Sequence, residues 1–169
     1  MLSINRKIKI IGTYNKNKIK NFKNVKFVEI DLEKNIKSVL KIIDKLQPVN
    51  IYYFATPKID ISINKLKNKR RIYKDFYVKF PEKILKFSKY KDINFFYPST
   101  DFINKTNNDY AMIKKIAEKK LILLNSNIKI LRIEPVYTRQ NLSFTSNQMP
   151  TFVELLNKKI NYQKKLFFI

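Results

Sequence analysis

The hydrophobic positions of the chain follow two patterns that alternate along the sequence. Short stretches that alternate with a period of two, or are almost continuously apolar, predict β-strands at residues 7–14, 25–31, 50–55, 94–97 and 128–133. Longer stretches with apolar residues at intervals of three and four predict amphipathic helices at residues 34–46, 70–90 and 107–125. A short helix is expected at 150–157, followed by a final strand or a loose tail.

Strands and helices that follow one another in this way predict parallel strands joined by helical crossovers. A chain of 169 residues is long enough for one ordinary domain with its own core. The pattern therefore predicts an α/β fold with a parallel sheet of about five strands. In such sheets the reactive groups lie beyond the carboxyl ends of the strands.

The composition excludes several classes of site. Cysteine and histidine are both absent, so the sequence predicts no disulfide, no metal site and no serine–histidine triad. No apolar run approaches the roughly 18 residues that a membrane span needs, and the first residues lack the apolar block of a signal peptide. We expect a soluble, cytoplasmic protein without a membrane segment.

The net charge of +23 raises the possibility of a nucleic-acid partner. Lysine is spread almost evenly along the chain, however, and arginine is scarce, whereas a nucleic-acid surface would gather its charges. The distribution favours a background bias in composition, with only weak, non-specific RNA binding. A basic nucleic-acid-binding protein stays an alternative interpretation.

The candidate chemistry begins where the apolar run at residues 94–97 ends in Ser99 and Thr100. Tyr110 and Lys114 follow at the start of the last helical pattern, four residues apart and so on one face of the helix. A nearby ammonium favours the phenolate form of a tyrosine, and a neighbouring hydroxyl can share a substrate oxygen. These residues predict a proton-transfer site.

Other polar residues fall at or just beyond predicted strand ends, among them Asp31, Thr56 and Glu134. Asp31 has two equal interpretations, because it could contact a ligand or cap the helix that follows it. Ser99, Thr100 and Asp101 could likewise be a plain strand exit and turn.

The ordered set of motifs resembles the extended short-chain dehydrogenases/reductases, the family of NAD-dependent sugar epimerases and dehydratases. The resemblance covers roughly residues 7–140 and rests on strand–Asp31-Leu32, Gln47-Pro48-x-x-Ile51-Tyr52-x-x-Ala55, Ser99-Thr100-Asp101, Tyr110-x-x-x-Lys114-x-x-x-Glu118 and Leu131-Arg132. It implies a truncated, three-layer Rossmann-like domain over residues 1–169. Residues 1–140 would be its core, and residues 141–169 would start the substrate-binding extension.

The resemblance also implies roles for individual residues in a reaction on a nucleotide sugar. Tyr110 would be the general acid/base, and Lys114 would lower its pKa and hold the nicotinamide ribose. Thr100, with Ser99 beside it, would bind the substrate oxygen. Asp101 stands where the dehydratases carry a catalytic acid, but the glutamate that usually follows is Phe102 here.

The implied cofactor is NAD or NADP. Asp31 would approach the adenine, Ala55 and Thr56 would line the nicotinamide side, and residues 13–15 would lie near the adenosine ribose. The family opens with a strand, a glycine-rich turn and a helix whose amide groups hold the pyrophosphate. Gly12 is the only glycine of this chain and resembles the end of the second strand, so cofactor binding is expected to be impaired or lost.

Two further interpretations follow from that departure. The chain could be a non-catalytic remnant that acts as a binding partner, or it could pair with a second copy. In this family the helices that correspond to residues 70–90 and 107–125 form a dimer interface, so the resemblance implies a homodimer through them.

Overall fold

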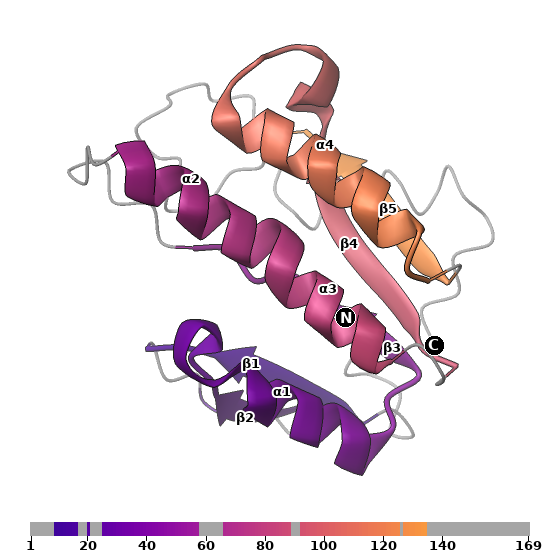
Figure 1. Cartoon of the computed structure of the whole chain (residues 1–169). Helices are drawn as coiled ribbons and strands as arrows, with labels where there is room; N and C mark the ends of the chain where they lie inside the picture. Colours follow the sequence, from indigo (N-terminus) through magenta and orange to yellow (C-terminus); the bar gives the residue numbers. More distant parts are fainter. Residues whose placement is uncertain are drawn as a thin grey trace. The chain divides into compact units, whose positions relative to one another are not determined.

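The computed structural model describes residues 9–16, 20, 25–57, 66–88, 92–125 and 127–134. They belong to two compact units, the first up to Leu46 and the second from Gln47 onward, and each is described by itself (Figure 1). The predicted helix at 150–157 and the segment after it lie outside the described residues. Among the described residues, no helix is long and apolar enough to cross a bilayer.

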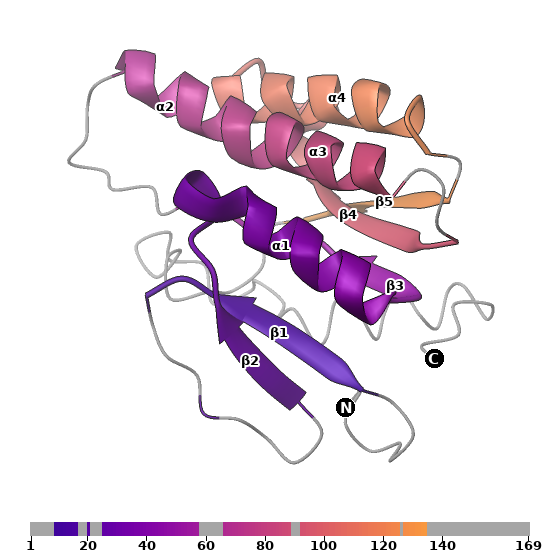
Figure 2. The ribbon, with the colours of Figure 1, turned by 60° about the horizontal axis from the view of Figure 1, so that its bottom comes forward.

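The first unit contains strands β1 (Ile10–Tyr14) and β2 (Val25–Glu29), which pair in parallel (Figure 2). Gly12 lies directly opposite Phe27 in this ladder. A Cβ atom on Gly12 would stand 2.5 Å from Cε1 of the Phe27 ring, closer than two carbon atoms can pack. The one glycine of the chain is therefore explained by the ring that covers it.

Helix α1 (Leu32–Leu46) follows and confirms the helix predicted over 34–46. It is interrupted at Asn35, whose backbone is non-helical, with φ −143° and ψ 56°. The Asn35 side chain accepts a hydrogen bond from the Ser38 amide at 3.2 Å, which starts the helix again as an N-cap does.

The second unit has a three-stranded parallel sheet with the order β3 (Asn50–Tyr52), β4 (Asn94–Thr100), β5 (Ile128–Ile133). The α/β class and the parallel pairing predicted from the sequence are confirmed. The described strands form two sheets, of two and three strands, instead of one continuous sheet. Strand β3 is also shorter than the predicted 50–55, because its parallel ladder with β4 ends at Tyr52.

Two helical segments lie side by side, and the second of them packs on β4 and β5 (Figures 1 and 2). One is a continuous run of α2 (Leu66–Lys74), the π-helical turn η1 (Asp75–Lys79) and α3 (Phe80–Phe87). The other is α4 (Asp109–Ile122), which confirms the helix predicted over 107–125. Between helices and sheet lies the apolar core of this unit, which includes Ile84, Leu85, Phe95, Tyr97, Ala117 and Leu121.

The π-helical turn has a cause in the sequence. Pro81 has no N–H, and its ring would clash with the carbonyl four residues earlier in a regular α-helix. The wider π turn directly before it relieves that clash. The carbonyls of Phe76 and Tyr77, five and four residues before Pro81, accept hydrogen bonds from the Tyr53 and Tyr97 hydroxyls, at 2.6 and 2.9 Å. The helix thus accommodates Pro81 with a π turn.

Candidate proton-transfer site

The site is built at the carboxyl end of β4, where the strand runs into a 3-10 turn, η2 (Asp101–Asn104). Thr100 is the last residue of the strand and is 3% exposed. Its hydroxyl oxygen accepts a hydrogen bond from the Phe102 amide at 3.3 Å, which caps the turn. The Thr100 side chain is therefore held in one place, as the site needs.

Tyr110 approaches this hydroxyl from the first turn of α4. The helix is started by Asn108, whose side chain accepts a hydrogen bond from the Ala111 amide at 2.8 Å. The Thr100 hydroxyl lies close enough to the Tyr110 phenol to favour the phenolate form. Burial raises the pKa of Tyr110, the Thr100 hydroxyl lowers it in part, and nearby Tyr73 raises it again. The net effect is a raised pKa, with burial as the largest cause, and a lowering of this pKa by Lys114 stays a prediction.

The Lys114 amine lies near the Tyr110 ring and is itself buried. Its Nζ atom donates a hydrogen bond to the Pro98 carbonyl at 2.6 Å. Three aromatic rings surround the amine: Nζ lies 4.1 Å from the Tyr77 centroid, 4.6 Å from Tyr97 and 5.9 Å from Tyr110. Burial lowers the pKa of Lys114 to about 7, against an opposing effect of Glu118. Near neutral pH this amine is only partly charged, which weakens its effect on Tyr110.

Glu118 lies one turn further along α4 and is held by Arg132 of β5. Nε and Nη2 of Arg132 donate to the two carboxylate oxygens at 3.0 and 2.7 Å, a bidentate pair. Burial raises the pKa of Glu118, but Arg132, the Ser99 hydroxyl and Lys114 together hold it below its usual value. The pair ties α4 to the sheet directly behind Lys114.

Ser99 belongs with this pair instead of with Tyr110. Its Oγ atom is fully buried and completes no hydrogen bond of standard geometry, although it lies close enough to stabilise the Glu118 carboxylate. Asp101 interacts electrostatically with Arg132 from the start of η2. The structure thus brings Thr100, Tyr110 and Lys114 together and places Ser99 one step away from them.

The predicted cofactor residues divide between the two units. Thr56 follows β3 with an exposed side chain, and its Oγ1 atom lies 3.0 Å from the Tyr77 hydroxyl. Since the Tyr77 ring also covers Lys114, Thr56 is connected to the proton-transfer residues through one side chain. Ala55 precedes it in the same extended segment.

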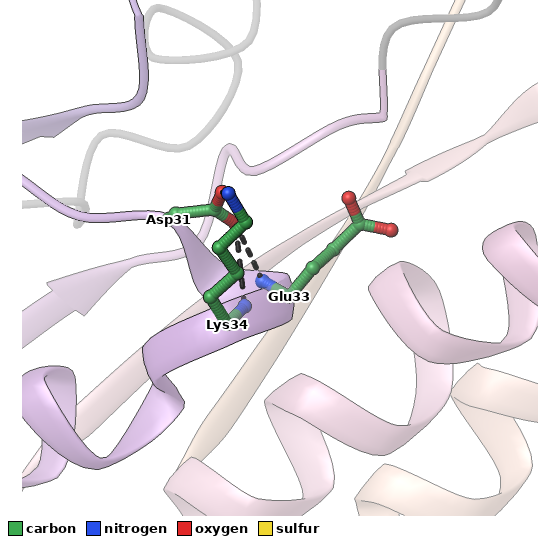
Figure 3. A network of polar contacts seen from close by, with 3 residues as sticks. All are labelled: Asp31, Glu33 and Lys34. Carbon is green, nitrogen blue, oxygen red and sulfur yellow. Dashed lines mark hydrogen bonds and ion pairs between the residues drawn. The ribbon is translucent and has the colours of Figure 1, made fainter.

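Asp31 is in the first unit and acts as a cap (Figure 3). Its Oδ1 atom accepts hydrogen bonds from the amides of Glu33 and Lys34 at 3.0 and 3.3 Å, and Oδ2 lies 3.9 Å from Nζ of Lys34. The structure therefore supports the interpretation of Asp31 as a helix cap. A contact with adenine stays a prediction.

Tyr77 is the residue of this site that the sequence pattern did not predict. The helix predicted over 70–90 rests on its aliphatic and phenylalanine positions, which do not include Tyr77. One signal was available: Tyr77 stands four residues before Pro81, so its carbonyl cannot have an ordinary helical partner. Among the described residues there is no cluster of three or more acidic side chains that could hold a metal ion.

Comparison with solved structures identifies the architecture. WbmH of Bordetella bronchiseptica, in complex with NAD+, matches with a TM-score of 0.61 and 18% identity over 79% of this chain and 50% of that one. A UDP-glucose 4-epimerase of Thermotoga maritima with UDP-glucose matches with 0.61 and 16% identity over 81% and 51%. The fold is that of the extended short-chain dehydrogenases/reductases.

A third structure with this fold is a dTDP-4-dehydrorhamnose reductase of Bacillus anthracis in complex with NADP. It matches with a TM-score of 0.58 and 16% identity over 95% of this chain and 61% of that one. The chain thus spans about half to three fifths of the length of these short-chain dehydrogenase/reductase structures. No family model and no curated protein matches the sequence.

Proposed function

We propose that the second unit provides the proton-transfer half of a nucleotide-sugar oxidoreductase site. The observation that carries this proposal is the proximity of the Thr100 and Tyr110 hydroxyls at the carboxyl end of a central parallel strand, with Lys114 one turn along the same helix. Reactive groups in open parallel sheets gather at that end. The fold shared with sugar epimerases and reductases supports the same assignment.

In this proposal Tyr110 takes the proton from a sugar hydroxyl, or returns it, while Thr100 holds the same oxygen. A bound NAD or NADP would supply the hydride acceptor or donor. The raised pKa of Tyr110 keeps the phenol protonated at neutral pH, so the resting enzyme is prepared to act as the acid. To act as the base, Tyr110 must first lose its proton, which requires the charged form of Lys114 beside it.

In this proposal Lys114 and Thr56 serve the nicotinamide end of a dinucleotide. The charged Lys114 amine has three N–H donors, of which the Pro98 carbonyl takes one. Thr56 is exposed, and its hydroxyl lies 3.0 Å from that of Tyr77. These are the residues that would hold the nicotinamide ribose. The 169 residues offer a single glycine, so a glycine-rich pyrophosphate turn is not among them, and we propose weak binding by this chain.

Calorimetric titration with NADH and NADPH tests this proposal. We expect one of the two to bind with a dissociation constant of about 1 mM, or about −4 kcal/mol. Lys114→Met is expected to abolish that binding, because the variant loses the ribose donor. Lys115→Met removes an exposed lysine from the same helix and should leave the binding unchanged. Absence of any heat with either cofactor at about 10 mM would sink the enzyme proposal.

A second candidate function, pairing with another copy of the chain, is favoured by the outer face of α4. Met112, Ile116 and Leu123 are 39%, 49% and 85% exposed, and their spacing of four and seven residues puts them on one stripe. The opposite face of the helix, with Ala117 and Leu121, is fully buried. An exposed apolar stripe of this kind is more typical of an interface than of a solvated helix.

Sedimentation analysis separates the dimer from the monomer. We expect a dimer at about 50 µM, a dissociation constant in the micromolar range being typical of a modest interface. Ile116→Lys should give a monomer, since it places a charge in the middle of the stripe. Ile122→Lys, with a substitution beside the stripe, serves as the matched control. A monomer at every concentration of the unchanged chain contradicts the interface.

A further inference from the structure

The side chain of Tyr77 contacts Lys114 with its ring and Thr56 with its hydroxyl. The ring face lies 4.1 Å from Nζ of Lys114, well within the range of a cation–π contact. The hydroxyl lies 3.0 Å from Oγ1 of Thr56, at the end of the segment that follows β3. Tyr77 is 5% exposed and Lys114 is 4% exposed, so the contact between ring and amine is shielded from bulk water.

The backbone of Tyr77 adds a third contact. Because of Pro81, its carbonyl accepts from the Tyr97 hydroxyl at 2.9 Å, and Tyr97 is the second ring that covers Lys114. Tyr110 packs edge-on against Tyr77 with 5.5 Å between the ring centroids. One residue of the π turn therefore contacts the Thr56 hydroxyl, the Lys114 amine and the Tyr110 ring.

We propose that Tyr77 is a positioning residue that holds the Lys114 amine and the Thr56 hydroxyl in fixed relation to Tyr110. The ring face stabilises the charged amine in a site where burial works against that charge. The hydroxyl holds the Thr56 side chain through their hydrogen bond. This proposal deepens the oxidoreductase proposal and rests on it for its functional meaning, but the positioning itself can be measured without a cofactor.

The alternative to a positioning role is ordinary core packing, in which Tyr77 fills space between helix and sheet. The two roles differ in what the side chain does to Lys114. A packing residue can be replaced by another apolar side chain with little effect on the titration of the amine. A ring that stabilises the cation cannot, because leucine has no negative face to offer.

The experiment uses the full chain with ¹³C at the lysine Cε atoms, whose NMR shifts follow the titration of each amine. Lys114→Arg identifies the Lys114 resonance. We expect Tyr77→Leu to lower the Lys114 titration midpoint by about one pH unit. Tyr73→Leu is the matched control, since Tyr73 is buried on the same helix and packs against Tyr77 and Tyr110 but has its cation contact with Lys69. It should leave the midpoint unchanged.

Tyr77→Phe keeps the ring and removes only the hydroxyl. This variant is expected to keep the Lys114 midpoint and to increase the mobility of the Thr56 methyl group, measured by NMR relaxation. It also keeps the test decisive if Tyr77→Leu fails to fold. An unchanged or higher midpoint in Tyr77→Leu, an equal shift in Tyr73→Leu, or an immobile Thr56 methyl in Tyr77→Phe overturns the proposal. Failure of cofactor binding alone would leave these three results as they are and would count against the oxidoreductase proposal only.

Discussion

Lys114→Met is expected to make the protein more stable at pH 7, by about 2 kcal/mol. The amine of Lys114 is buried without a salt bridge among the described residues, and burial lowers its pKa to about 7. Methionine fills a similar volume and carries no charge. The gain is limited because the Pro98 carbonyl, which accepts from Nζ at 2.6 Å, loses its partner.

The same substitution should change how stability depends on pH. The pKa of Lys114 is lowered in the folded protein, so between pH 7 and its ordinary value the unfolded chain binds a proton that the folded chain does not. Stability therefore rises with pH in that window, by about 1.4 kcal/mol per pH unit, and is lowest below pH 7. Lys114→Met should remove this contribution.

Urea unfolding at pH 6, 7, 8 and 9 measures both effects. Burial raises the pKa of Tyr53, Tyr77 and Tyr97. Their contribution to stability is lost above about pH 10, where the tyrosines of the unfolded chain ionise. The measurements stop at pH 9 to avoid this effect. Lys115→Met is the control. If the stability of Lys114→Met depends on pH as steeply as that of the unchanged protein, burial does not lower the pKa of Lys114. The geometry of the site is then different.

Arg132→Met is expected to lower the free energy of unfolding by about 2–3 kcal/mol. The Glu118 side chain is 9% exposed, and Arg132 supplies both hydrogen bonds to its oxygens. Without Arg132 the carboxylate stays buried and poorly paired, which costs far more than the loss of a surface ion pair. Stability falls although the substituted side chain is itself half exposed.

A double-mutant cycle distinguishes this pair from its surroundings. Glu118→Gln removes the buried charge, so Arg132→Met should cost much less in that background than alone. Lys86→Met is the comparison at the surface: Lys86 pairs with Glu82, which is also bound by Lys120, and its loss should cost less than about 1 kcal/mol. Equal costs for Arg132→Met and Lys86→Met, measured by urea unfolding, would rule out a buried pair.

Much of the fold could be predicted because its elements are local. The alternation of apolar and polar residues over 128–133 predicts β5 with the bounds that the structure has. The apolar stripe with Ile113, Ala117 and Leu121 predicts α4. The division into two sheets depends on long-range pairing. The periodicity of each strand does not show which strands pair, so it could not predict that β1 and β2 form one sheet and β3, β4 and β5 another.

The candidate site could be predicted where spacing alone decides proximity. Four residues along one helix brought Tyr110 and Lys114 together, and the strand end brought Thr100 to them. The direction of the Tyr110 pKa could not be predicted, because it depends on burial by residues distant in the sequence. The partner of Lys114, the Pro98 carbonyl, and the ring of Tyr77 likewise depend on how α4 and the π turn pack on the sheet.

The central claim is that Thr100, Tyr110 and Lys114 form a site that accepts the nicotinamide end of a dinucleotide. Its most direct test is to follow the ¹³Cε resonance of Lys114 during titration with NADH and NADPH. We predict a progressive, saturable shift of this resonance with one of the cofactors, with no comparable shift for Lys115. A Lys114 resonance that stays in place up to about 10 mM of both cofactors would contradict the claim.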